Sequence, residues 1–99
     1  MFYDYRTDVY ELVEDGRLVN VLNGRFFTVE QVENVLEIAT PVQDVAEFFR
    51  DKIEKVERHK STLEKYLQYA DGGAYYQDKK RIAECRDEIA SIKRFLGDA

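Results

Sequence analysis

The 99 residues are enough for one domain with a modest core. A net charge of -5 and a pI near 4.9 argue against general affinity for nucleic acid or membranes, because both need positive charge on the contact surface. No apolar run approaches the ~18 residues of a membrane span, the start lacks the basic and apolar regions of a signal peptide, and one cysteine fits a reducing compartment. We therefore expect a cytoplasmic protein.

The charge is unevenly distributed along the chain. Residues 1–48 contain ten acids and three arginines, a net charge of -7, whereas residues 49–99 contain ten acids and twelve bases, a net charge of +2. The N-terminal half is therefore acidic, and a local basic patch in the C-terminal half is compatible with the overall acidity.

Residues 2–13 alternate between polar and apolar side chains and are rich in aromatic and β-branched residues, which is typical of a strand. With the segments that follow, they predict a small antiparallel β-hairpin or meander over residues 1–27. We expect strands at residues 8–13 and 17–22, an extension of the first strand towards Tyr3, and a third short strand at residues 25–27. Asp15-Gly16 and Asn23-Gly24 supply the two turns, the first of them as a type I′ hairpin turn.

Two helix starts follow the predicted strands. Thr28 and Gln31 have the spacing of a capping box, which predicts a short helix over residues 28–39. Its buried side is expected to hold Val29, Val32, either Val35 or Leu36, and Ala39. Thr40-Pro41 repeats the signal with proline at the first helical position, so we expect a second, long helix over residues 41–70.

Apolar residues recur every seven positions in two arms, at residues 41–70 and 74–96, as in a coiled coil. Asp71-Gly72-Gly73 separates the arms, which predicts an antiparallel helical hairpin. Residues whose numbers sum to about 145 should then face each other, and this rule joins apolar partners throughout: Val56 with Ile89, Ile53 with Ile92, and Phe49 with Leu96.

The predicted fold is α+β, with residues 1–99 forming a single domain. Tyr66 is expected within the apolar seam of the first arm, and a wider apolar stripe extends around the helix through Phe48, Phe49, Ile53 and Leu67, beyond what one partner helix covers. We therefore expect a homodimer that forms a helical bundle.

Aromatic residues among the acids of the N-terminal half suggest a contact surface for a basic partner, as in inhibitors that mimic DNA. Tyrosine supplies rigid contact area of the kind found at interface hot spots. The candidate partner-binding residues are Tyr3, Tyr5, Asp8, Tyr10 and Glu11.

A basic and aromatic tract just after the turn suggests an alternative, a nucleic-acid contact through phosphate pairing and base stacking. Its residues are Tyr75, Tyr76, Lys79, Lys80 and Arg81, and Tyr66 and Tyr69 should lie near the same end of the hairpin. Neighbouring acids and the overall acidity disfavour this alternative.

His59 and Cys85 fall in one layer of the hairpin and are potential zinc ligands or a nucleophile with its base. Zinc takes four ligands, however, so we expect a half-buried histidine beside a small apolar cysteine. No catalytic, metal or cofactor motif appears in the sequence, which predicts a non-catalytic protein without cofactors. Small size, acidity and the lack of such motifs are typical of accessory proteins with which phages and other mobile elements modulate a host protein.

Overall fold

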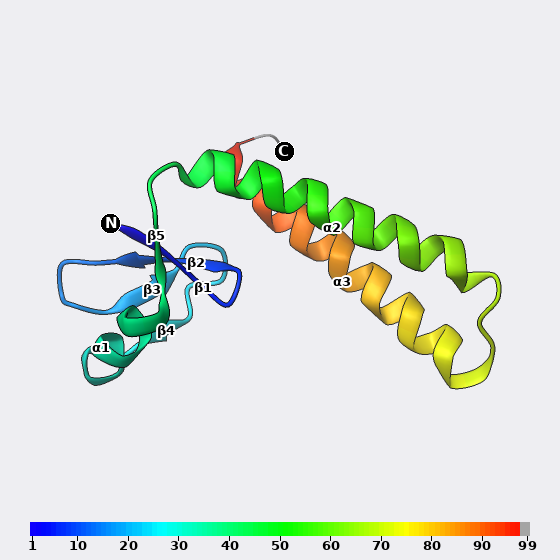
Figure 1. The fold of residues 1–99 in the computed structure, drawn as a ribbon, viewed down its shortest axis with the longest axis horizontal. Coiled ribbons are helices and arrows are strands. Elements are labelled where there is room, and N and C mark those ends of the chain that lie inside the picture. The colour runs from blue at the N-terminus through cyan, green and yellow to red at the C-terminus, as the bar shows by residue number, and fades with distance from the viewer. Residues whose placement is uncertain (98–99) are drawn as a thin grey trace. The chain divides into compact units, whose positions relative to one another are not determined.

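In the computed structural model, which describes residues 1–97, an antiparallel sheet and a short helix precede two long helices (Figure 1). This arrangement confirms the predicted α+β fold with its helical hairpin. Over the described residues the order of elements is β1 (Phe2–Tyr5), β2 (Asp8–Leu12), β3 (Leu18–Asn20), β4 (Phe26–Phe27), α1 (Val29–Ile38), β5 (Thr40–Val42), α2 (Val45–Leu67) and α3 (Gly72–Leu96). None of these helices is both long and apolar enough to cross a bilayer.

The chain divides into two compact units. The first, Met1–Phe48, holds the sheet and α1, and is called the sheet unit below. The second begins at Phe49 and holds nearly all of α2 together with α3; it is called the hairpin unit.

The sheet has the order β4-β3-β2-β1-β5 and all of its neighbouring strands are antiparallel. The sequence predicted two or three strands, and the additional ones are β1 and β5. Tyr3 of β1 lies opposite Tyr10 of β2 on one side and Pro41 of β5 on the other. Proline suits β5 because this strand lies at the edge of the sheet, where an N–H on its outer side has no ladder partner.

The strand predicted at residues 8–13 is present as β2, but its expected extension towards Tyr3 is a separate strand, β1, because the chain reverses at Arg6 and Thr7. Tyr5 pairs with Asp8 across this two-residue turn, and both turn residues have positive φ, 51° and 68°. Positive φ at both positions is the type I′ conformation, which usually selects asparagine and glycine. The sequence carries neither residue here, so it gave no turn signal.

The turn predicted at Asp15-Gly16 is present, but it is a three-residue loop and not a type I′ turn. The N–H of Val13 donates to the carbonyl of Arg17 (3.0 Å), and of the loop residues only Gly16 has positive φ. A three-residue hairpin loop commonly ends on a residue in this left-handed conformation, for which glycine is the least strained choice.

The second turn depends on Asn20, which is buried at the end of β3. Its side-chain oxygen accepts hydrogen bonds from the backbone N–H groups of Leu22 (2.9 Å) and Asn23 (3.2 Å). The N–H of Gly24 donates to the Asn20 carbonyl, and Gly24 has the positive φ that the turn requires. A buried amide with this many partners holds the β3–β4 connection in one conformation.

Helix α1 begins where its capping box predicts, and the N–H of Thr28 donates to Gln31 Oε1 (3.0 Å). Val32 and Val35 pack with Leu18 of β3 to form the core of the sheet unit. Val29 was expected on the buried side as well, but it lies in the first turn of the helix and is 56% exposed.

The long helix predicted from Pro41 begins four residues later, at Val45. Asp44 is its N-cap: the N–H of Glu47 donates to Asp44 Oδ1 (3.0 Å), and the N–H of Phe48 donates to the Asp44 carbonyl (3.0 Å). The sequence therefore contained two successive start signals. Pairing with β1 holds the first of them, Thr40-Pro41, in a strand.

Helices α2 and α3 pack together side by side in the hairpin unit (Figure 1). The Phe49 ring meets the Phe95 ring edge-on at 5.2 Å, one residue from the predicted partner Leu96. Phe49, Ile89 and Ile92 are all buried, as the predicted pairing requires. Helix α2 ends at Leu67, three residues before its predicted end at residue 70. Helix α3 begins at Gly72, two residues before its predicted start at residue 74.

Candidate functional site

The predicted N-terminal tyrosines belong mainly to the core of the sheet unit. Tyr3, Tyr5 and Tyr10 are half-buried and pack against the cluster around Leu18. The Tyr5 and Tyr10 rings also lie 5.5 and 5.2 Å from the ring of Phe27. Much of the contact area that these tyrosines were expected to offer a partner is therefore used inside the fold.

The two acids of the same candidate set lie on different faces. Asp8 pairs with Tyr5 across the β1–β2 turn, whereas Glu11 pairs with Phe2. Because side chains alternate along a strand, Glu11 lies on the opposite face of the sheet from Tyr10. The structure thus does not gather the five residues on one face, and their contact role stays a prediction.

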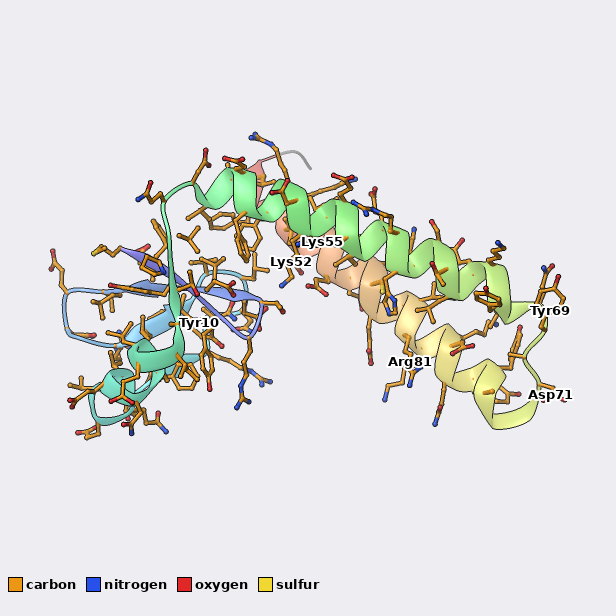
Figure 2. The ribbon with its side chains drawn as sticks, in the orientation of Figure 1. Tyr10, Lys52, Lys55, Tyr69, Asp71 and Arg81 are labelled. Atoms are coloured by element: carbon orange, nitrogen blue, oxygen red, sulfur yellow. The ribbon has the colours of Figure 1, made fainter. Side chains whose placement is uncertain are left out.

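Exposed tyrosines gather instead at the end of the helical hairpin where α2 and α3 are connected, residues 65–81, which we call the hairpin tip. Tyr66 is 57% exposed, Tyr69 77% and Tyr76 74%. Figure 2 shows Tyr69 at the connection between α2 and α3, close to Asp71. Tyr66 was predicted to lie in the apolar seam of the first arm, but it projects into solvent.

The bases of the alternative site are adjacent in sequence, but the helix directs them to three different environments. Lys79 Nζ lies 5.1 Å from the centre of the Tyr75 ring, and Arg81 Nη1 lies 3.9 Å from Asp78 Oδ1. Lys80 lies between them and is exposed without an ion pair in the described chain. Successive residues of an α-helix are 100° apart, so three in a row do not form one basic face.

Tyr75 differs from the other tyrosines of the tip. It is half-buried, and its ring meets the Tyr76 ring edge-on at 5.7 Å. Tyr76 remains exposed, and Lys80 follows it by four residues on α3. That spacing places Tyr76 and Lys80 on the same side of the helix.

The hairpin tip has a net charge of +2, from Lys65, Lys79, Lys80 and Arg81 against Asp71 and Asp78. Of these groups, Asp78 and Arg81 form an ion pair with each other. Among residues 1–97, neither Lys65 nor Lys80 has an ion-pair partner. The tip therefore combines exposed aromatic rings with unneutralised positive charge.

His59 and Cys85 lie in unlike environments. His59 is exposed and not half-buried as predicted, whereas Cys85 is buried in the helical interface. Burial raises the pKa of the Cys85 thiol, Glu88 and Glu84 add to the effect, and Lys60 opposes it. A raised pKa keeps the thiol protonated at neutral pH and lowers its nucleophilicity. Residues 1–97 contain no group of three potential metal ligands.

The apolar stripe that led us to expect a homodimer is covered more completely than the sequence indicated. Phe49 is buried, Phe48, Ile53 and Leu67 are half-buried, and no valine, leucine or isoleucine of α2 or α3 is exposed. A second copy is therefore not required to cover this stripe, and the homodimer stays a prediction.

Comparison with protein-family models, with curated proteins and with solved structures finds no match for the chain. The function must therefore be argued from the surfaces themselves. Tyr66 and Tyr69 were included in neither of the two predicted sets of contact residues. The sequence did carry a signal for them, because both lie within a few residues of the Gly72-Gly73 break, where the helical seam ends.

Proposed function

We propose that this chain is a small non-catalytic protein-binding module and that the hairpin tip is its contact surface. The observation that carries the proposal is the exposure of Tyr66, Tyr69 and Tyr76 within eleven residues of sequence. Tyrosine buries a large area while ordering few rotatable bonds, so exposed tyrosines in a cluster are typical of protein interfaces.

The solvent-exposed rings of Tyr66 and Tyr69 support a binding role for these residues over a structural one. Tyr75 has a clear packing role, since it lies against Lys79 and Tyr76. Tyr66 and Tyr69 have no aromatic or ion-pair partner in the described part of the chain. Side chains that contribute little to the fold and expose much apolar area are available to a partner.

The arrangement of charge favours a protein partner over a nucleic acid. A single strand is usually held in a continuous basic groove with bases stacked on successive aromatic rings. Here Lys79 and Arg81 are engaged within the chain, and the three consecutive bases point in different directions. Nucleic-acid binding through this tract therefore remains the second candidate.

The experiment compares tagged wild type with the Tyr69→Ser/Tyr76→Ser variant in lysate of the native cells, with and without nuclease, using quantitative mass spectrometry. Loss of hot-spot tyrosines should reduce recovery of a specific protein at least ~30-fold, whether or not nuclease is present. Ile38→Ser is the matched control, because it removes an apolar side chain that is 69% exposed on α1. Equal recovery with wild type and the double variant would refute the proposal, and recovery that disappears with nuclease would favour the second candidate.

A further inference from the structure

The outer face of α1 carries exposed negative charge, whereas the hairpin tip carries a net positive charge. Glu30, Glu33 and Glu37 recur at helical spacing, all three are exposed, and none has an ion-pair partner among residues 1–97. Helix α1 contains no lysine or arginine. Val29, which is 56% exposed, lies one turn before Glu33 and adds an apolar side chain beside this acidic face.

We propose that the hairpin tip docks on the outer face of α1 in a second copy of the chain. This inference rests on the proposed function of the tip and names its partner. Charge complementarity supports it: the sheet unit carries -7, the tip carries +2, and the lysines and glutamates concerned are not neutralised within the chain. Opposite charge on two surfaces brings them together and fixes their register.

The spacing within each surface supports the same pairing. On α3, Tyr76 and Lys80 are one turn apart, and on α1 Val29 and Glu33 have the same four-residue spacing, about 6 Å along each axis. If the helices run in the same direction where they cross, Tyr76 lies on Val29 while Lys80 approaches Glu33. The apolar pair excludes water at the point where the charges meet, which strengthens their attraction.

The contact joins two different surfaces, so it is heterologous. The tip lies at the C-terminal end of α2, about 33 Å along the helix from Val45. Two reciprocal contacts would give a closed dimer, and single contacts would give an open chain of copies. Either form makes the mass of the particle depend on protein concentration.

The test is sedimentation equilibrium of the purified chain from 1 to 200 µM (about the range of weak to moderate affinities), in low and in high salt. We expect the mean mass to rise with concentration in low salt and the association to weaken about 10-fold in high salt. Lys80→Glu and Glu33→Lys should each weaken association about 10-fold, and their combination should restore it to within about threefold.

Lys55→Glu is the matched control, because it makes the same charge change on α2 away from the tip and should leave association unchanged. A constant monomer mass at every concentration would overturn the inference, and so would association that Lys80→Glu and Glu33→Lys leave intact. The two proposals can be told apart by their outcomes. If the chain stays monomeric while Tyr69→Ser/Tyr76→Ser still abolishes recovery of another protein, the self-association is refuted and the proposed function is supported.

Discussion

Lys52 of α2 and Glu88 of α3 form an ion pair, with 3.0 Å between Lys52 Nζ and Glu88 Oε1. The lysine side chain is only 11% exposed, so its charge is largely removed from water. An ion pair in such a position fixes the register of two helices more firmly than a surface pair, because separating the charges leaves one of them poorly solvated.

Replacing Glu88 with glutamine should therefore lower the free energy of unfolding by about 1–2 kcal/mol. Glu54→Gln is the control, since it breaks a solvent-exposed pair with Arg58 and should cost less than about 0.5 kcal/mol. Urea unfolding followed by circular dichroism measures both. Equal losses in the two variants would contradict the role assigned to the Lys52–Glu88 pair.

The β1–β2 turn should be strained, because Thr7 is β-branched and has a φ of 68°. Thr7→Gly removes this strain and should raise the unfolding free energy by about 1 kcal/mol, after allowing for the greater freedom of glycine in the unfolded chain. Gly24→Ala provides the opposite case, since Gly24 has a φ of 75° and the added methyl should cost about 1 kcal/mol. Destabilisation by Thr7→Gly, measured by urea unfolding, would show that the turn is not strained.

Replacing Asn20 should destabilise the β3–β4 connection. Asn20→Ala leaves the N–H groups of Leu22 and Asn23 without their acceptor in a partly buried position, and should cost about 1–3 kcal/mol. Asn23→Ala removes one exposed hydrogen bond, from the N–H of Arg25, and should cost less than about 1 kcal/mol. Thermal unfolding distinguishes the two variants, and a similar fall in both would argue against a special role for Asn20.

Alkaline pH should destabilise the hairpin through Cys85. Its pKa is raised in the folded chain, mainly by burial, so the thiol loses its proton more readily when unfolded. The contribution is fully present below the unfolded pKa, near about 8.5–9, and is lost as pH rises through the folded value. Wild type and Cys85→Ala should therefore differ by a constant amount up to about pH 8 and converge above pH 9, as measured by urea unfolding across this range. Parallel pH profiles would show that the thiol is not responsible.

Periodicity predicted the helical hairpin well because a long helix repeats its signal over many turns. The positions of Phe49, Ile89 and Ile92 followed from one turn position at Gly72 and Gly73, and the structure buries all three. The sheet was harder to predict. Strand β5 is three residues long and carries a helix-start signal, so only its pairing with β1 makes it a strand.

The exposure of the candidate site residues was harder to predict than the fold. Tyrosines in an acidic stretch look the same in sequence whether their rings face solvent or a core. Tyr10 turns inward because α1 covers that face of the sheet, which alternation alone does not show. Tyr69 projects outward because α2 has already ended at Leu67, two residues before it.

The most direct test of the hairpin tip as the contact surface is site-specific photo-crosslinking. Benzoylphenylalanine is placed at position 76 in one sample and at position 11, on the sheet unit, in another. We expect protein crosslinks from position 76 and few from position 11, because Tyr76 is exposed at the tip whereas Glu11 belongs to β2 of the sheet unit. Crosslinks that form from position 11 and not from position 76 would contradict the claim and return the contact to the acidic N-terminal surface.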